Sequence, residues 1–243
     1  MRISLLVFLV ASLVAAILLR ESMLRARLLR SDPSVIASTP ALLAFAKPRG
    51  ERLYRVHCST CHGVRGLGDS GRGIPNLSDN DWLYGTGQVS DIEQVILYGI
   101  RSNNPKAWNL AAMPAYGTAQ PGAQESKIPQ LSPANIRDVV EFLFYSQGRN
   151  ADTAAAARGR AIFAGVGGCY DCHSLDAKGD SSIGAPNLTD RITLYGDGSR
   201  NSLSMSISYG RAGMCPAWFG RLRPAEIREL AVFVYTLSHP ERL

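Results

Sequence analysis

The chain has 243 residues, enough for a membrane anchor and two domains of ~100 residues each. Its net charge of +6 is uneven, because residues 1–32 hold five arginines against Glu21 and Asp32, which leaves only +3 for the rest. This distribution excludes a basic surface for nucleic acid, and five cysteines, four of them in two short motifs, exclude a disulfide framework.

The first predicted element is an apolar helix near the N-terminus. Residues 3–19 form an unbroken run of apolar or small side chains, long enough to approach a membrane span and longer than the usual core of a signal peptide. No small-x-small cleavage site follows directly. The sequence therefore favours an uncleaved, single-pass anchor over residues 1–30, with a cleaved signal peptide as the alternative.

Arginines follow this apolar run instead of preceding it. The positive-inside tendency would place the C-terminal side of the helix in the cytoplasm, because four arginines follow the apolar run: Arg20, Arg25, Arg27 and Arg30. Leucines between them predict that the helix continues as an amphipathic stalk, with the arginines at lipid head groups or on a partner subunit. Residues 31–46 contain prolines and small polar side chains, and are predicted to be a linker.

Two pentapeptides carry the chemistry. Cys-x-x-Cys-His is the pattern to which c-type haem is attached. Two thiols one helical turn apart can both add to the haem vinyl groups, and the histidine then lies under the iron as its proximal ligand. The motifs are Cys58, Cys61 and His62 (the first haem motif) and Cys169, Cys172 and His173 (the second haem motif).

The sequence therefore predicts two covalently attached haem c groups. Covalent attachment takes place on the outer face of the bacterial inner membrane. Both motifs are accordingly predicted to lie in the periplasm, and this evidence outweighs the positions of the arginines.

The two motifs belong to an internal repeat. At a constant offset of 111 residues the first motif, the loop Pro75-Asn76-Leu77 and the segment Leu83-Tyr84-Gly85 all recur in the second half of the chain. The second copy then lacks nine residues, so that Met113-Pro114 falls on Cys215-Pro216. A capped helix is predicted near the end of each copy, from Ser132-Pro133 to Gly148 and from Pro224 to about Leu237.

This order of parts resembles a class I cytochrome c domain, repeated. The resemblance implies an all-α protein, with an N-terminal transmembrane helix followed by two tandem class I cytochrome c domains. The domains would span 47–148 and 158–243, joined by a linker at 149–157. In that family the carbonyl of the loop proline, here Pro75 or Pro186, accepts a hydrogen bond from the proximal histidine and fixes its tautomer.

A distal methionine completes the iron coordination in this family and raises the reduction potential. Met113 is the expected distal ligand in the first domain, opposite His62. In the second domain the equivalent position is Cys215. A one-residue shift of the loop would bring Met214 to the iron, which is our first expectation; without the shift Cys215 faces the iron, and Met205 or an open site is the third possibility. A thiolate ligand would lower the potential.

At finer grain the chain resembles the dihaem subunit III of cbb3-type cytochrome c oxidases. The sequence segments that carry this resemblance are Pro75-Asn76-Leu77 with Trp82-Leu83-Tyr84-Gly85, their counterparts from Pro186 to Gly196, and Pro216-Ala217-Trp218. The resemblance implies an electron-transfer subunit without catalysis of its own, held in the bacterial inner membrane beside the other oxidase subunits.

Such a subunit would take electrons from a soluble cytochrome c or a quinol-oxidising complex. It would pass them to the catalytic subunit of a haem-copper oxidase in aerobic or microaerobic respiration. The alternatives are a free-standing dihaem carrier similar to cytochrome c4 and, less favoured, a dihaem peroxidase.

Overall fold

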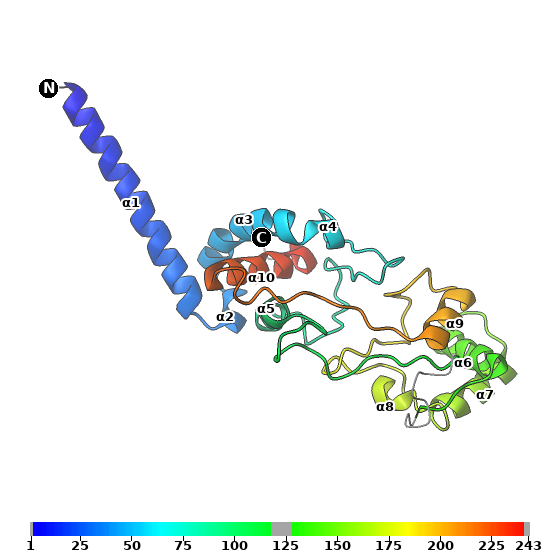
Figure 1. The fold of residues 1–243 in the computed structure, drawn as a ribbon. Helices are drawn as coiled ribbons and strands as arrows, with labels where there is room; N and C mark the ends of the chain where they lie inside the picture. Colours follow the sequence, from blue (N-terminus) through cyan, green and yellow to red (C-terminus); the bar gives the residue numbers. More distant parts are fainter. Residues whose placement is uncertain (1, 118–127, 241–243) are drawn as a thin grey trace.

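The computed structural model describes residues 2–117 and 128–240, and the regular structure of these residues is α-helical, as the sequence predicts (Figure 1). Extended segments in these ranges form only isolated bridges. The helices are α1 (Arg2–Arg30), α2 (Pro33–Ile36), α3 (Pro40–His57), α4 (Ser59–His62), α5 (Val89–Tyr98), α6 (Pro133–Ser146), α7 (Thr153–Phe163), α8 (Tyr170–His173), α9 (Arg200–Tyr209) and α10 (Pro224–Ser238).

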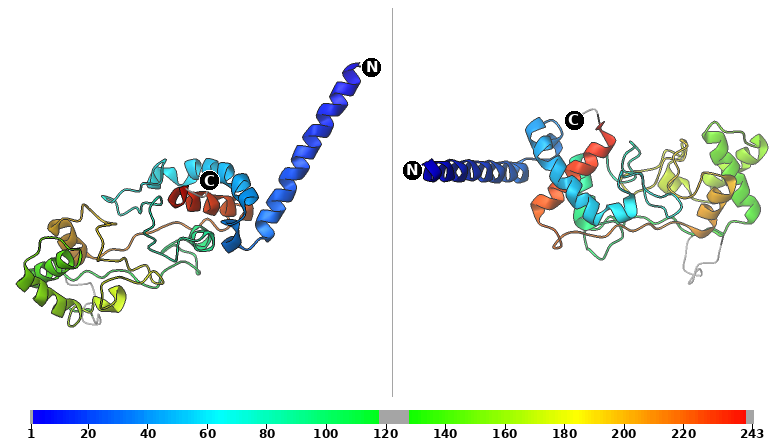
Figure 2. Two further views of the ribbon diagram at one scale, coloured as in Figure 1. Left: turned by 180° about the vertical axis from the view of Figure 1, so that it is seen from behind. Right: turned by 90° about the horizontal axis from the view of Figure 1, so that it is seen from above.

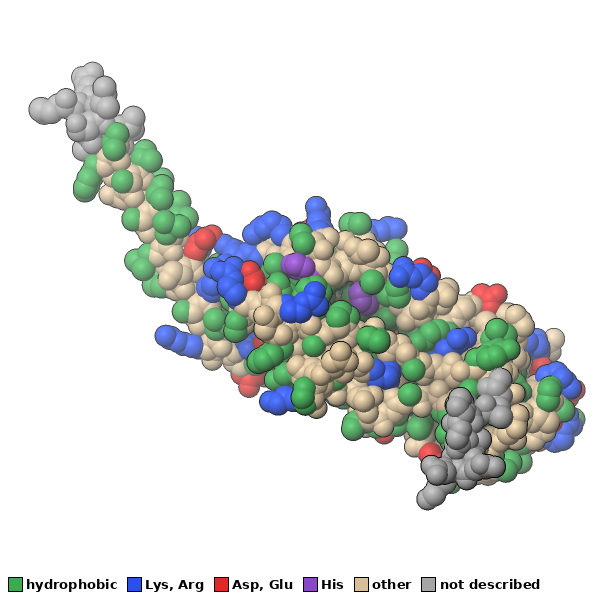
Figure 3. Space-filling view, in the orientation of Figure 1, with side chains coloured by type: hydrophobic (Ala, Val, Ile, Leu, Met, Phe, Trp, Pro, Cys, Tyr) green, Lys and Arg blue, Asp and Glu red, His purple; other side chains and the backbone are tan. Residues whose placement is uncertain are grey.

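Helix α1 projects from the body of the molecule as a single straight element (Figures 1 and 2). Within the described residues it is the one helix long and apolar enough to cross a membrane, over Val7–Arg30. Its apolar side chains from Val7 to Leu19 are exposed (Figure 3). Because a continuous apolar surface of this kind is unfavourable in water, α1 fits the expected membrane anchor.

The last turns of α1 belong to the folded body. Leu28 is fully buried, and Leu24 packs against the same apolar cluster. The guanidinium of Arg228 in α10 donates hydrogen bonds to the carbonyl oxygens of Leu28 and Ser31, at 3.0 and 2.9 Å. The helix thus continues through its arginines as expected, and Leu28 faces the core of this chain.

The two segments expected to be linkers differ from that expectation. Residues 31–46 contain α2 and the start of α3, and Ile36, Leu42 and Phe45 are buried. Both helices begin with proline, whose missing N–H costs nothing in a first turn. In the second segment α7 already begins at Thr153, where the side chain of Asp152 caps it. Prolines and small residues therefore mark helix starts at these places.

The helices pair across the two repeats. Helix α10, from the second repeat, packs on α3 and α5 of the first, while α6, from the first repeat, packs on α7 and α9 of the second (Figures 1 and 2). We call α3, α4, α5 and α10 the first unit, and α6, α7, α8 and α9 the second unit. Each unit contains one haem motif, and the two predicted tandem domains, 47–148 and 158–243, are each divided between both units.

The short connection between α6 and α7 accounts for this exchange. Residues 147–152 join the two helices, and a connection of this length returns the chain antiparallel beside the helix it has just left. Arg158 of α7 then donates two hydrogen bonds to the carboxylate of Asp138 in α6, at 2.8 and 2.7 Å. With α6 held there, the equivalent face of α3 is covered by α10.

Two glycines allow the paired helices to cross closely. Gly50 of α3 lies against the carbonyl group of Glu229 in α10, and Gly159 of α7 lies against that of Asp138 in α6. The aromatic contacts beside them also correspond, since ring centroids are 5.1 Å apart both for Tyr54 with Phe233 and for Phe142 with Phe163. The same crossing is built twice, each time with the terminal helix of the other repeat.

We expect Gly159→Ala to lower the free energy of unfolding by about 1–3 kcal/mol, because the new methyl group would overlap the Asp138 carbonyl. This cost outweighs the ~0.5–1 kcal/mol that alanine normally gains over glycine inside a helix. Guanidinium unfolding of the detergent-solubilised protein, followed by circular dichroism, measures it. Gly71→Ala is the control, since its methyl group would meet only Asp69 Oδ1, at 3.2 Å. Equal stability of the two variants would contradict the close crossing.

Candidate functional site

Both haem motifs form a single helical turn that directly follows a longer helix or its loop. In α4 the His62 N–H donates to the Cys58 carbonyl at 3.0 Å, and in α8 the His173 N–H donates to the Cys169 carbonyl at 2.9 Å. Residues three apart on a helical turn share one face, so the two thiols of each motif are neighbours. All four motif cysteines are free of disulfides, and the first and second motifs therefore each present two thiols and an imidazole.

The two histidines are held in the same way. Nδ1 of His62 lies 3.2 Å from the carbonyl oxygen of Pro75, and Nδ1 of His173 lies 3.1 Å from that of Pro186. A carbonyl only accepts, so Nδ1 carries the proton and Nε2 keeps a free lone pair. Burial lowers the pKa of both imidazoles, against the opposing effect of this hydrogen bond. Each histidine is therefore neutral near pH 7 and able to bind a metal through Nε2.

A glycine brings each proline carbonyl close to its histidine. Gly68 and Gly179 have φ of +68° and +78°, and a side chain at either would overlap the carbonyl group of Pro75 or Pro186. The N–H of Gly68 also donates to the His62 carbonyl at 3.0 Å. The loop after each motif thus curls back under the imidazole.

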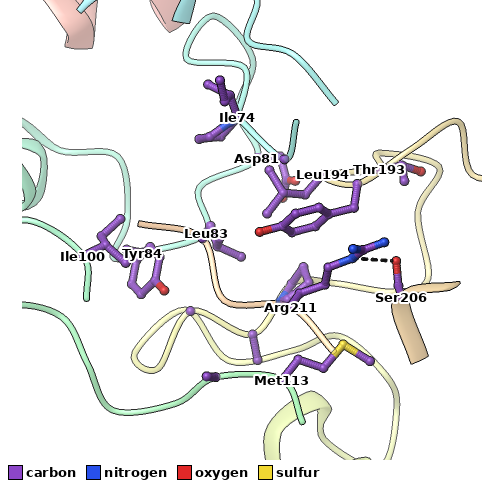
Figure 4. A pocket seen from close by; sticks show the side chains of 18 of the residues that line it. Ile74, Asp81, Leu83, Tyr84, Ile100, Met113, Thr193, Leu194, Ser206 and Arg211 are labelled. Atoms are coloured by element: carbon purple, nitrogen blue, oxygen red, sulfur yellow. Dashed lines mark hydrogen bonds between the residues drawn. The ribbon is translucent and has the colours of Figure 1, made fainter. Parts of the chain in front are cut away.

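The two motifs line one continuous apolar cavity of about 560 Å³. His62 and His173 both border it, as do Met113 and Cys215. Figure 4 shows the part where the repeats meet, with Leu83 and Tyr84 on one side and Thr193 and Leu194 on the other. Two haem-binding compartments that open into each other would have this shape.

The repeats are interlocked around this cavity. Tyr84 packs against Gly184 of the second repeat, and its counterpart Tyr195 packs against Gly73 of the first. The backbone N–H groups of the following glycines likewise donate across the boundary, to the carbonyls of Ser181 and Ser70 at 3.1 and 2.8 Å. Each contact has a partner in which the repeats change places, so the two halves are related by an approximate two-fold axis.

The loops expected to supply the distal ligands also cross between units. Met113 packs against the buried apolar cluster of the second unit, and so do Cys169 and Leu188. Tyr116, three residues later, is close to Cys169 and Cys172, and burial together with these thiols raises its pKa. Met113 is thus near the second haem motif. This position differs from the expected one, opposite His62 of the first haem motif.

The segment around Cys215 lies in the first unit. Burial raises the pKa of the Cys215 thiol to about 11, and the nearby Cys61 thiol adds to this shift. Cys58, with a pKa raised to about 12, is affected by burial and then by Cys215. Trp218 packs against His57, with ring centroids 4.9 Å apart. Cys215 therefore borders the cavity on the side of the first haem motif.

Neither alternative methionine is well placed. Met214 touches the edge of the cavity, but 76% of its surface is exposed, and Met205 on α9 is 45% exposed. The first expectation, that a loop shift brings Met214 to an iron, is therefore not the arrangement of this structure.

Haem fits the residues that are present. Motif thiols, neutral imidazoles and an apolar wall meet the needs of the macrocycle, while its two carboxylates need polar partners. The hydroxyl group of Tyr84 is buried and has no hydrogen-bond partner among the described residues. Arg101 is close to it, and Arg211 lines the same region, where it donates to Ser206 Oγ at 3.1 Å (Figure 4).

Sequence reasoning missed these polar groups at the boundary of the two repeats. A signal did exist for Tyr84, because Leu-Tyr-Gly recurs at the repeat offset with Tyr195. Arg101 and Arg211 carried none, since they are not equivalent at the repeat offset and border the same cavity only because the loops of the two repeats interlock.

Known proteins resemble this chain over most of its length. A model of the family described as cytochrome c matches residues 48–146. The chain is 37% identical to the Cbb3-type cytochrome c oxidase subunit CcoP of Cereibacter sphaeroides over 218 residues, which are 90% of this chain and 70% of that protein. It is 40% identical to the subunit FixP of Bradyrhizobium sp. (strain ORS 278) over 207 residues, 84% of this chain and 65% of that protein. For CcoP of Rhodobacter capsulatus the identity is 37% over 220 residues, with coverages of 87% and 69%.

Proposed function

Because the chain belongs to the family of cbb3-type cytochrome c oxidase subunits named CcoP and FixP, we propose that it is a membrane-anchored dihaem cytochrome that relays electrons to the catalytic subunit of a haem-copper oxidase. One observation carries the proposal. In a chain with a membrane-length helix, two haem motifs each hold a histidine oriented by a proline carbonyl. The role would serve aerobic or microaerobic respiration.

Two haem c groups are part of the proposal. The first would be attached through Cys58 and Cys61, with His62 as its proximal ligand. The second would be attached through Cys169 and Cys172, with His173. Bound haem supplies reversible one-electron chemistry. The protein's own groups attach it, fix the imidazole tautomer through Pro75 and Pro186, and exclude water from the apolar cavity.

Met113 is proposed as the distal ligand of the second haem, although it comes from the first repeat. Its packing against the same apolar cluster as Cys169 and Leu188 supports this assignment, as does the position of Tyr116 near the second haem motif. A thioether sulfur is neutral and raises the reduction potential relative to an anionic ligand. The second haem would therefore accept electrons readily.

Electrons would pass between the haems inside the protein. Both motifs border one continuous cavity, and the interlocked repeats hold the two compartments together. A haem iron with two protein ligands has no open position for a substrate. The subunit would therefore transfer electrons without catalysing a reaction itself.

The proposed location is the bacterial inner membrane, with α1 crossing once and both units in the periplasm. Covalent haem attachment on the outer face supports this orientation. The apolar surface of α1 would contact lipid and the other oxidase subunits. A soluble cytochrome c or a quinol-oxidising complex would be the electron donor.

Purification from native membranes tests this function. The chain, carrying a C-terminal tag and extracted in a mild detergent, is expected to copurify with a haem-copper subunit and with oxygen-reducing activity. The control is the same tag on an unrelated single-pass protein. A chain that retains two haems but purifies without a haem-copper partner would contradict the oxidase role and favour a free-standing carrier.

A further inference from the structure

We propose that Cys215 is the distal iron ligand of the haem attached at the first haem motif. The proposal rests on the proposed function in one respect, namely that haem is attached at Cys58 and Cys61. It is independent of the complex in which the subunit works.

Backbone hydrogen bonds establish where Cys215 stands. In the second unit Met113 and Arg211 exchange two N–H to carbonyl hydrogen bonds, both of 2.9 Å. In the first unit Cys215 and Ile100 exchange the same two bonds, again both of 2.9 Å. Ile100 and Arg211 are equivalent at the repeat offset of 111 residues. Cys215 is therefore the structural counterpart of Met113.

The register is maintained beyond this pair. The Tyr116 N–H donates to the Ile207 carbonyl at 3.0 Å, and the Trp218 N–H donates to the Ile96 carbonyl at 3.0 Å, with the next residue of each loop repeating the pattern. Tyr116 and Trp218 follow Met113 and Cys215 by the same number of residues. A one-residue shift that brought Met214 into the cavity would break all of these bonds, so the loop is not shifted.

Side-chain direction separates the two candidate sulfur atoms. Successive side chains of an extended segment point to opposite sides. Both residues border the cavity, but Met214 leaves 76% of its surface exposed, whereas Cys215 is half-buried and lies near the Cys61 thiol of the first haem motif. Among the described residues the Cys215 sulfur has a single hydrogen bond, a weak one to the Pro216 carbonyl oxygen at 3.9 Å. It is therefore free to bind another group within the cavity.

Coordination would form an Fe–S bond and release the thiol proton to solvent, with no change in the oxidation state of the iron. A coordinated thiol is deprotonated, and its negative charge stabilises ferric over ferrous iron. Met113 brings no charge to the second haem. The first haem is thus the one with the lower reduction potential, and an electron entering the protein rests on the second.

Spectroscopy of the detergent-solubilised holoprotein tests the proposal. Electron paramagnetic resonance and near-infrared magnetic circular dichroism of the oxidised protein are expected to show one haem with histidine and methionine ligands and one with histidine and thiolate. In Cys215→Met the thiolate signal should disappear, the methionine charge-transfer band should double per protein, and the lower midpoint potential should rise. Met214→Leu, the matched control, should change none of these.

Two results would overturn the assignment. One is two methionine bands in the unmodified protein, and the other is loss of a ligand signal in Met214→Leu. Both are measured without Cys215→Met, so the assignment is decided even if that variant does not take up two haems. Failure to copurify with an oxidase would affect the proposed function alone and leave these spectra unchanged.

Discussion

Replacing Cys58 and Cys61 with serine is expected to leave a protein with half its haem but with its methionine charge-transfer band intact. Serine cannot form the thioether bonds, so the first haem is lost. Met113 is retained in its place because it packs against the apolar cluster of the second unit, as Cys169 does. Haem content from pyridine haemochrome spectra and the near-infrared spectrum of the oxidised protein measure the two effects.

The matched variant, with serine at Cys169 and Cys172, should give the reciprocal result. It should also keep half of the haem, but the methionine band should disappear, since Met113 then has no iron to bind. If each distal loop served the motif of its own repeat, the two variants would exchange their spectra. A methionine band that vanishes with the first motif and survives loss of the second would therefore disprove the exchanged arrangement.

The second large effect is expected at Arg228, which joins three elements. Arg228 Nε lies 2.7 Å from a carboxylate oxygen of Glu93 in α5, and each of these side chains is only 11% exposed. The same guanidinium bonds the carbonyl oxygens of Leu28 and Ser31 at the end of α1. One side chain of α10 thus fastens the anchor helix and the middle helix to the first unit.

Arg228→Met is expected to lower the free energy of unfolding by about 3–5 kcal/mol. The substitution leaves the Glu93 carboxylate buried without a counter-charge and two carbonyls without a donor. Guanidinium unfolding of the detergent-solubilised holoprotein, followed by the haem absorbance, measures the loss. If Arg228→Met lowered the free energy of unfolding by less than Gly159→Ala does, the ion pair of Arg228 with Glu93 would not be the main contact that stabilises the first unit.

Two further variants separate the buried pair from ordinary charge effects. In the double variant Arg228→Met, Glu93→Met most of the stability should return, because a buried ion pair replaced by apolar side chains is often neutral in free energy. Arg223→Ala removes the exposed pair with Glu226, in which the arginine is 73% exposed. Its expected cost is about 0–1 kcal/mol.

Features that depend on neighbouring residues could be predicted from the sequence. Ser132 caps α6 through its hydroxyl group, which accepts a hydrogen bond from the Asn135 N–H, and Pro224 opens α10. The proline carbonyls reach both histidines, as the family resemblance implied.

The exchange of terminal helices could not be predicted in this way. Helices α6 and α10 have the same apolar spacing, with Ile136 and Val140 corresponding to Ile227 and Ala231. Such a pattern predicts that one face of the helix is buried. It does not predict which of two nearly identical partner helices covers that face. The deciding quantity was the length of the connection. The linker predicted at 149–157 is longer than the observed connection at 147–152, because the alanines that follow Thr153 belong to α7.

Which residue occupies the distal position in the first unit depends on the register of one loop, to within a single residue. Met214 and Cys215 are adjacent and both carry sulfur, and sequence reasoning favoured the methionine because family members use one. Hydrogen bonds to a distant segment, at Ile100, distinguish them, together with the difference in their exposure. Tertiary context of this kind lies outside any local pattern.

The short connection between α6 and α7 also has a consequence for the order of biogenesis. The helices of the second unit are contiguous, from Pro133 to Tyr209, and can assemble as soon as that part of the chain has been exported. The first unit must wait for α10, which is synthesised after every helix of the second unit, before α3 is covered. The usual order, in which N-terminal domains fold first during synthesis, is therefore reversed. Premature termination near the C-terminus would remove α10 and would therefore disturb the haem site at the first haem motif more than the site at the second.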